Sequence, residues 1–433
     1  MYRTAKIHIT HNTAGGKYMD ILKKLCYHSA RMYNVGLYSV RQHFFNTQSY
    51  ISYYENYNLC KNNENYKLIY SSTAQQILRL VDRDMQSFFH LLKLKKQGRY
   101  DEKVKLPKYK NTEGVAMYIA QSQACRVHGN KIRHGLTKAF REIYSTDAKY
   151  IEFTCPSCVD LSTLKEMRII PKFGGAEFVV EFVYSKAEAE PSHSPGILSI
   201  DPGLSNLMTC TSFSGSTPSE SFIIDGRHIK NINYYYNKAK ARLQSMYDLT
   251  GVKGTTRRMR RLSNGRNNRI DAYFNEVCRY ICNYCKNNGI GTVVMGYNEG
   301  QKQEINIGKV NNQNYVMIPL HKLRQKLLSY CESNGISCVF QEESYTSKCC
   351  CLSLDAIPVY SDGVSVDDSV FHGKRVKRGL YRCDSGEVIN ADVNGSINIF
   401  RKYLKSKSKT ELSVDDVRAF VNRPVCRVNV LRH

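Results

Sequence analysis

The sequence predicts a multidomain α+β protein in which an N-terminal half of strands and helices precedes an α/β layer. Its 433 residues are enough for about two or three domains with a sizeable core. In the first half, a strand-like segment, a long helical region and a group of short strands follow one another. In the second half, strand-like and helix-like segments alternate, which is typical of helices packed on a sheet.

The N-terminal elements follow from the spacing of apolar residues. Residues 1–10 alternate like a strand rather than reading as a signal peptide. From about Tyr18 to Lys96 the spacing is helical, and the clearest helix follows Ser72 and ends at a basic turn before Gly98. The remaining stretch up to residue 190 predicts short strands, over 106–110, 150–154 and 176–184.

A polar, proline-rich segment at 185–196 predicts the main domain boundary. The elements predicted after it are a buried strand at 197–201, a strand around 207–213, two long helices within 230–288, a strand at 292–295, a helix at about 320–334 and a strand at 336–341. A basic loop with Gly251, Gly254 and Gly265 is expected to join the two long helices.

The charge of the chain favours nucleic acid as a partner. Lys and Arg number 63 against 38 Asp and Glu, a formal net charge of +25. The 31 tyrosines supply flat surfaces on which bases stack. One basic run has almost no acidic neighbour, so we expect it to contact a nucleic-acid backbone rather than form a solvated helix face: Arg257, Arg258, Arg260, Arg261, Arg266 and Arg269.

A membrane is not expected as a partner, because no apolar stretch approaches the roughly 20 residues that span a bilayer. The 16 cysteines lack the dense, regular pattern of a small secreted scaffold. Together with the strand-like N-terminus, this predicts a reducing cytosol with most thiols free.

Two aspartates carry most of the functional information. Asp201 ends an apolar run and is followed by Pro202 and Gly203. Asp392 lies at the head of a helix-like stretch that continues to Phe400. A strand and a helix that each deliver a carboxylate suit a nuclease that clamps two divalent cations roughly 4 Å apart.

This order of elements resembles an RNase H-like fold of the RuvC type. Four motifs, in the same order, are similar to those of the OrfB/TnpB family: Ile200-Asp-Pro-Gly-Leu204, Val294-Met-Gly-Tyr-Asn298 with Lys302-Gln-Glu304, Glu343-Ser-Tyr-Thr-Ser347, and Asn390-Ala-Asp-Val-Asn-Gly-Ser-Ile-Asn398. The segment from Phe371 to Tyr381 also resembles a subgroup of that family. The resemblance covers most of 196–402, whereas the N-terminal half matches only in general plan.

The family comprises transposon-encoded RNA-guided DNA nucleases related to compact type V CRISPR effectors. The resemblance therefore implies a guide RNA, a double-stranded DNA target, two Mg²⁺ ions and a prokaryotic or phage protein at the nucleoid, in the cytoplasm. It also implies five parts: a β-barrel wedge domain (1–14 and 101–190), a helical recognition lobe (15–100), a linker (191–196), a RuvC-like nuclease domain (197–344 and 389–433) and a degenerate zinc-knuckle-like insertion (345–388). The oligomeric state stays open.

A third carboxylate is expected, because two carboxylates would poorly neutralise two metal ions. The family's second acidic residue usually ends the strand that here reads Val293-Val-Met295, but Gly296 follows it. Glu343, at the end of the next predicted strand, is the preferred third ligand. Glu304 and Glu299 are the alternatives, and Glu343 could also be no more than a polar strand end.

The family's four-cysteine zinc knuckle is incomplete here. Such a site needs two close cysteine pairs, but Cys349–Cys351 form one cluster and Cys383 stands alone. A metal-free knuckle is therefore expected, and zinc is not; Cys350 and Cys383, with His372, are the weaker zinc alternative. The remaining residues expected to bind nucleic acid are Lys302, Lys374, Arg375, Lys377 and Arg378.

Two other functions remain open from the sequence. The missing carboxylate after Val294 keeps a nuclease-inactive RNA-guided DNA-binding protein in view. A guide-free resolvase or transposition accessory is the more distant alternative, since a nuclease domain alone would suffice for it and the large N-terminal half would have no use.

Overall fold

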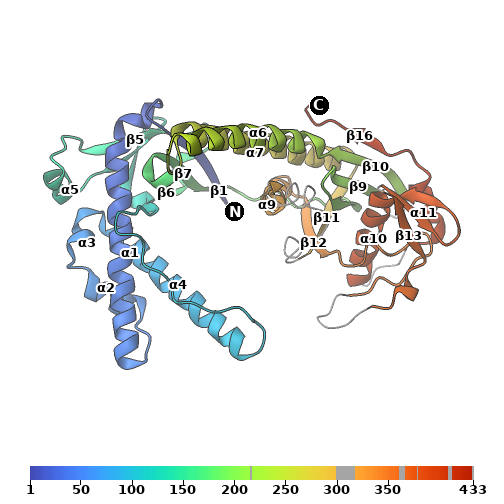
Figure 1. Cartoon of the computed structure of the whole chain (residues 1–433), viewed down its shortest axis with the longest axis horizontal. Helices are drawn as coiled ribbons and strands as arrows, with labels where there is room; N and C mark the ends of the chain where they lie inside the picture. Colours follow the sequence, from blue (N-terminus) through green and yellow to red (C-terminus); the bar gives the residue numbers. More distant parts are fainter. Residues whose placement is uncertain (215–216, 299–316, 360–365, 378, 408–411, 432–433) are drawn as a thin grey trace. The chain divides into compact units, whose positions relative to one another are not determined.

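The computed structural model describes residues 1–214, 217–298, 317–359, 366–377, 379–407 and 412–431 (Figure 1). The chain is a mixed α/β protein of two compact units, Met1–Ala187 and Glu188–His433. The division falls within the polar segment 185–196. None of the described helices is both long and apolar enough to cross a membrane.

The strands of the first unit form two sheets. The larger sheet is antiparallel and has the order β1-β7-β6-β2, with β1 at Tyr2–Ile9, β2 at Tyr118–Gln121, β6 at Leu164–Lys172 and β7 at Glu177–Ser185. The smaller sheet contains β3 (Cys125–His128), β4 (Lys131–Gly135) and β5 (Tyr150–Thr154). Among the described residues these sheets do not close into a single ring, so the predicted β-barrel is replaced by two separate sheets.

The predicted strand at 106–110 is wrong. Pro107 has no N–H to give to a strand ladder. Lys110 instead receives a hydrogen bond from the Asn34 side chain on its carbonyl oxygen (2.9 Å) and donates its N–H to the same side chain (2.7 Å). These contacts hold the segment along a helix rather than beside a strand.

The helical region of the first unit agrees with its predicted apolar spacing. Its helices are α1 (Met19–Thr47), α2 (Tyr53–Cys60), α3 (Glu64–Leu68), α4 (Ser71–Lys96) and, later in the chain, α5 (Lys138–Ile143). The buried stripe of α4, which includes Ile77 and Met85, faces the core. Gly36 lets α1 approach α4 closely, because a Cβ atom there would overlap a methyl group of Leu78.

His134 should make the first unit sensitive to acid. It is fully buried, donates from Nδ1 to the carbonyl oxygen of Ala124 (2.8 Å) and accepts at Nε2 from the Tyr118 hydroxyl (2.8 Å). Burial lowers the pKa of His134 from 6.5 to about 4. Between these values the unfolded chain binds a proton that the folded chain does not, so stability falls as the pH drops through this window, by about 3 kcal/mol in all.

His134→Gln should remove this pH dependence, because glutamine can serve both partners but does not ionise in this range. The measurement is urea unfolding followed by circular dichroism between pH 4.5 and 7. An unchanged pH slope in the variant would assign the acid sensitivity to other groups.

The second unit is built on a six-stranded sheet with the order β12-β11-β8-β9-β10-β16. The strands are β8 (Gly196–Pro202), β9 (Asn206–Ser214), β10 (Thr217–Asp225), β11 (Ile290–Tyr297), β12 (Ser337–Glu342) and β16 (Cys426–Val428). β8, β9 and β10 are antiparallel neighbours, whereas β11 runs parallel to both β8 and β12, and β16 parallel to β10. The predicted alternation of strands and helices is confirmed.

Helices cover both faces of this sheet. They are α6 (Arg227–Leu249), α7 (Arg257–Asn287), α9 (Leu320–Ser333), α10 (Ala391–Ser406) and α11 (Val414–Val421). Because successive strand residues point to opposite faces, Leu198 and Ile200 pack with α7 and α9, whereas Ile197 packs with α10 and α11. The central strands are therefore apolar on both sides, as the continuous apolar run before Asp201 predicts.

The basic run that begins at Arg257 lies on a helix, so its predicted position in a loop is wrong. The Thr256 side chain accepts a hydrogen bond from the Met259 amide (3.3 Å) and caps α7 immediately before Arg257. Gly265 lies inside the helix, and the connection between α6 and α7 is confined to residues 250–256.

The insertion before α10 contains a small antiparallel sheet. Its strands are β13 (Gly373–Lys377), β14 (Leu380–Cys383) and β15 (Val388–Asn390), and β15 runs directly into α10. Short 3-10 turns complete the described elements, at Ala14–Tyr18, Ser122–Ala124, Leu161–Thr163, Phe173–Gly175 and Asp368–Val370.

Candidate active site

The three carboxylates favoured by the sequence line one polar cavity of about 870 Å³ in the second unit. Asp201 lies near the C-terminal end of β8, Glu343 directly follows β12, and Asp392 lies in the first turn of α10. Since β8, β11 and β12 are parallel, their C-terminal ends meet at the same edge of the sheet. α10 packs on β8 and brings Asp392 to that edge.

Asp201 shares the cavity with the carboxylates of Glu343 and Asp392. Burial raises the pKa of its carboxyl group well above the ordinary value, and the carboxylates of Glu343 and Asp392 raise it further, whereas Arg375 lowers it. Gly395 makes the approach of α10 possible, because a Cβ atom there would lie 2.5 Å from Asp201 Oδ2. A cation bound here would relieve the repulsion that the folded chain imposes.

Glu343 fills the space that a side chain at position 296 would occupy. A Cβ atom on Gly296 of β11 would overlap Glu343 Oε2. The Glu343 N–H bonds to the carbonyl oxygen of Tyr297 (3.2 Å) and extends the pairing of β12 with β11 by one residue. A carboxylate from the neighbouring strand therefore reaches the place where the OrfB/TnpB resemblance puts an acidic residue.

Glu342 has a different role from Glu343. Its carboxylate pairs with Lys402 of α10 and accepts the Ser344 N–H (2.6 Å). Burial alone would raise the pKa of Glu342, but these contacts outweigh it and leave the pKa lowered. Glu342 thus fixes the strand end to α10, while Glu343 faces the other two carboxylates.

Asp392 is positioned by the start of α10. The Asn390 side chain caps the helix by accepting from the amides of Asp392 (2.9 Å) and Val393 (3.2 Å). The helix dipole favours a carboxylate in this first turn. Asp392 Oδ2 accepts from the Asn206 side chain (2.6 Å), and Oδ1 accepts from Arg375 (3.2 Å).

Sequence reasoning missed Asn206, which orients Asp392 from the start of β9. Its side-chain oxygen accepts in turn from Arg427 of β16 (2.9 Å). Asn206 follows the glycine turn after Asp201, and that position was a usable signal. No sequence signal pointed to Arg427, because its strand is three residues long and pairs with a distant part of the chain.

The donor set of the cavity fits magnesium. Carboxylate oxygens are the hard ligands that Mg²⁺ prefers, and three of them around one cavity supply the charge that two divalent ions need. Within the described ranges, no three acidic, histidine or cysteine side chains already stand close enough together to hold a metal ion. Asp392 is instead engaged with Asn206 and Arg375.

The basic residues of the insertion divide between two faces of β13. Arg375 and Lys377 line the cavity, and Lys374, which alternates with them, is exposed outside its lining. The remaining predicted residues, which are the alternative ligands Glu299 and Glu304 and the basic residues Lys302 and Arg378, lie outside the described residues.

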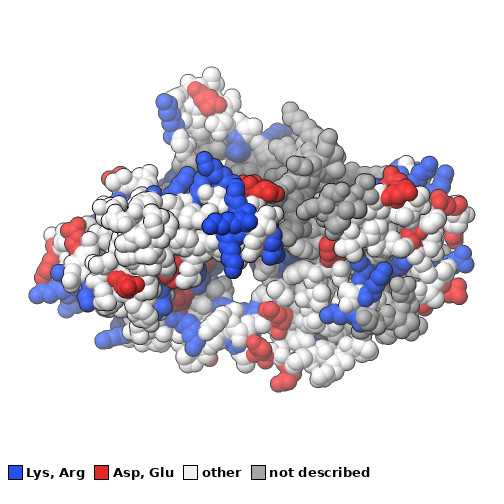
Figure 2. Space-filling view, turned by 90° about the horizontal axis from the view of Figure 1, so that it is seen from below, with Lys and Arg blue, Asp and Glu red and all other residues white. Residues whose placement is uncertain are grey.

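The basic run at the start of α7 also divides. Arg257, Arg258 and Arg261 are exposed, as a nucleic-acid contact requires. Arg266 instead donates to the Asn233 side chain of α6 (2.9 Å) and to the carbonyl oxygen of Met317 (2.5 Å). It therefore ties the two helices together. Lysine and arginine side chains gather in several patches on the face shown in Figure 2.

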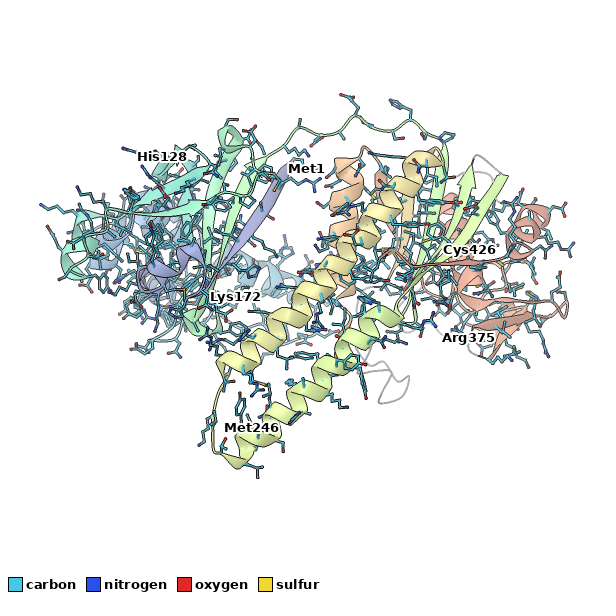
Figure 3. All side chains as sticks on the ribbon, turned by 90° about the horizontal axis from the view of Figure 1, so that it is seen from above. Met1, His128, Lys172, Met246, Arg375 and Cys426 are labelled. Carbon is cyan, nitrogen blue, oxygen red and sulfur yellow. The ribbon has the colours of Figure 1, made fainter. Side chains whose placement is uncertain are left out.

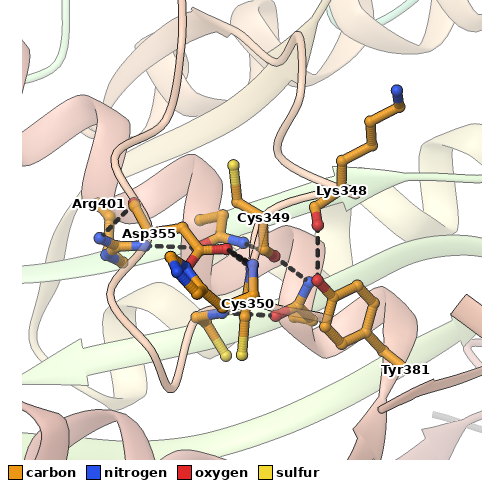
Figure 4. Close-up of polar contacts among 10 residues, drawn as sticks. Lys348, Cys349, Cys350, Asp355, Tyr381 and Arg401 are labelled. Carbon is orange, nitrogen blue, oxygen red and sulfur yellow. Dashed lines mark hydrogen bonds and ion pairs between the residues drawn. The ribbon is translucent and has the colours of Figure 1, made fainter. Parts of the chain in front are cut away.

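A buried aspartate joins the two segments on which a zinc knuckle would be built (Figure 4). Asp355 accepts from the amides of Cys350 (2.6 Å) and His372 (3.0 Å), and from the His372 ring (2.8 Å). The Tyr381 hydroxyl adds a bond to the carbonyl oxygen of Lys348 (2.6 Å).

The remaining ligand candidates of the knuckle are buried. Cys350 and Cys383 both lie in the core beneath Tyr381. Burial, followed by a hydrogen bond with the Cys350 thiol, raises the pKa of Cys383. The neutral thiol is therefore the favoured form of Cys383.

Comparisons with known proteins agree with the motifs. The OrfB_IS605 family model, described as a probable transposase, matches residues 181–302, and the model of the Cas12f1-like TNB domain matches residues 321–399. A TnpB-like protein, ORF457 of Acidianus two-tailed virus, is 22% identical over 426 residues, with 88% of this chain and 83% of that protein covered.

The fold also has a solved counterpart. The Cas12f1 chain of a cryo-EM structure of the Cas12f1-sgRNA-target DNA complex is similar, with a TM-score of 0.59 at 14% identity, and 88% of this chain and 82% of that chain are covered. At this identity the likeness concerns the fold alone. The residues that the two family models match lie almost entirely in the second unit, and the viral relative spans both units. In sequence, the chain is therefore similar to the OrfB/TnpB family.

Proposed function

We propose that this protein is a transposon-associated, RNA-guided DNA endonuclease that uses two Mg²⁺ ions. The observation that carries the proposal is the meeting of Asp201, Glu343 and Asp392 around one cavity, from three separate elements of the sheet and its covering helix. The order β12-β11-β8-β9-β10, with its antiparallel β8-β9-β10 half, supports an RNase H-like nuclease domain of the RuvC type.

The proposed partners are a guide RNA and a double-stranded DNA target. The similar Cas12f1 chain belongs to a complex with sgRNA and target DNA, and the net charge of +25 suits such a partner. Sequence would be read mainly by base pairing between guide and target, with the protein binding the heteroduplex by its backbone.

Six residues of the cavity have roles in this proposal. Asp201, Glu343 and Asp392 would hold Mg²⁺, which when bound activates water and stabilises the leaving 3′ oxygen of the phosphodiester. Asn206 would keep Asp392 turned towards the cavity. Arg375 and Lys377 would bind the phosphate, because a guanidinium or ammonium group forms charge-assisted hydrogen bonds with phosphate oxygens.

A nuclease-inactive binder is the second candidate, and Gly296 is the observation that favours it. Glu343 weakens that argument, because its carboxylate fills the space beside Gly296. The two candidates therefore differ in one point, which is whether a carboxylate from the end of β12 can replace the one that is missing from β11 and complete the metal site.

The test begins with the RNA that copurifies with the protein. After this RNA is sequenced, a duplex that matches its variable part is incubated with the complex and Mg²⁺, and a matched duplex with EDTA serves as control. The proposal expects cleavage of the matching duplex alone. Guided binding without cleavage would favour the inactive binder, and cleavage without RNA would favour a guide-free resolvase.

A further inference from the structure

The hairpin of α6 and α7 carries a groove at the end farthest from the sheet. The groove has a volume of about 1130 Å³, and Met246 marks its position near the end of the hairpin in Figure 3. The buried residues of α6 end at Asn233, and those of α7 begin only at Ile270. The far half of the hairpin therefore lacks a buried core, and contacts between the two helices hold it together.

These contacts cross from one helix to the other at both ends of the groove. Tyr247 of α6 accepts a hydrogen bond from the Thr256 hydroxyl (2.9 Å), and Tyr236 bonds to Ser263 of α7 (3.3 Å). Arg266 adds its bond to Asn233. These bonds join the two helices on both sides of the groove.

The floor of the groove is apolar and accessible. Tyr235, Ala239, Leu243 and Met246 follow one another at helical spacing on one face of α6, and Leu262 faces them from α7. Tyr235 is 66% exposed and Met246 40% exposed. A large aromatic ring that is exposed on a solvated helix offers a flat surface to a ligand.

The rim of the groove is basic. Lys238 and Arg242 of α6 and Arg258 and Arg261 of α7 line it, and all four side chains are exposed. Asp248 is the single acidic residue of the sequence between Lys238 and Arg261. The groove therefore attracts a polyanion, and its floor offers apolar contact in addition to charge.

We propose that this groove binds the unpaired nucleotides of a nucleic-acid strand. Phosphates would lie along the basic rim, and one base would stack on the Tyr235 ring. A duplex keeps its base faces inside the stack, so it could use the rim but not the floor, whereas a single strand uses both. An acidic protein segment would likewise use the rim, but it has no planar group to place on Tyr235.

The proposal goes beyond guided cleavage and does not depend on it. The chain contains no tryptophan, so Tyr235→Trp introduces the sole indole of the protein. Tyr234 is the matched control: it is 60% exposed on the same helix but does not line the groove, and Tyr234→Trp places the probe one residue away. Both variants are full-length and are freed of copurified RNA before use.

Oligo(dT) and oligo(rU) are the probes, and a duplex of equal length and polyglutamate are the comparison polyanions. Either single strand should quench the Tyr235→Trp emission and protect it from acrylamide, and should leave Tyr234→Trp almost unchanged. The probe that quenches this emission at the lower concentration shows whether the groove prefers DNA or RNA. Duplex and polyglutamate should change neither emission.

A binding measurement on Tyr235→Ala completes the test. This variant should weaken single-strand affinity about tenfold, because one base loses the ring on which it stacks. Equal quenching of the two tryptophan variants, or quenching by polyglutamate, would overturn the proposal and leave a general basic surface. Quenching of the Tyr235→Trp emission without any guided cleavage would contradict the nuclease function but not the groove. Guided cleavage with no change in the Tyr235→Trp emission would contradict the proposed role of the groove but not the nuclease function.

Discussion

Asp201→Ala and Asp392→Ala should each abolish Mg²⁺-dependent DNA cleavage and leave guide-RNA binding intact. Each variant removes one carboxylate from the cavity, and neither changes the exposed basic residues of the α6–α7 hairpin. A metal ion stabilises the charge of the transition state by several kcal/mol, so the cleavage rate should fall about a thousandfold or more. Single-turnover cleavage of a matched duplex measures the rate, and gel shift measures the RNA affinity.

Asp384→Ala is the control for these variants. Asp384 lies exposed in the turn between β14 and β15, and it does not line the cavity. The Asp384→Ala variant should cleave DNA at the normal rate. Persistent cleavage by a folded Asp201→Ala protein would remove Asp201 from the metal site, and loss of RNA binding in that variant would mean that the carboxylates act on the fold instead.

Glu343→Gln should lose most cleavage, while Glu342→Gln should retain it. The amide keeps the shape of Glu343 but removes a charge that would balance the cations. Glu342 is the neighbouring residue and pairs with Lys402, so its loss affects the strand end rather than the cavity. The comparison of cleavage rates at equal guided DNA binding separates the two glutamates. Normal activity of Glu343→Gln would redirect the assignment to Glu299 or Glu304.

The same carboxylate can be tested through Gly296. Gly296→Ala should impair cleavage as well, because the new Cβ atom would displace the Glu343 carboxylate. The double variant Gly296→Glu, Glu343→Gly moves the glutamate carboxylate from the end of β12 to β11. It should restore part of the cleavage activity that Glu343→Gly alone removes. A double variant no better than the single one would show that the two strand ends cannot exchange the ligand.

The sequence was most informative where function depends on local structure. Asp201 follows an apolar run that is buried on both faces, and Asp392 follows the capping residue Asn390, so strand end and helix start could both be predicted. The sequence could not show that Glu342 and Glu343 have different partners. The partner of Glu342 is Lys402, which reaches it from a helix about sixty residues later in the chain.

Features that depend on distant pairing escaped prediction. The short strand β16 joins β10 across the chain, and its pattern of three residues carries no periodic signal. Closure of a barrel depends on how strands pair at the edges, so the first unit could not be distinguished from two open sheets. The loop predicted around Arg257 failed because the cap formed by Thr256 was overlooked.

The helix α10 has one further consequence, which concerns how the protein tolerates change. Its residues from Val393 to Leu404 are all buried, polar ones included. Ser396 bonds to Ser199 of the sheet (3.1 Å), and Asn398 bonds to Cys349 of the insertion (2.8 Å). An ordinary surface helix offers one face on which substitutions cost little, but α10 has no such face. Natural variation should therefore avoid this helix almost entirely.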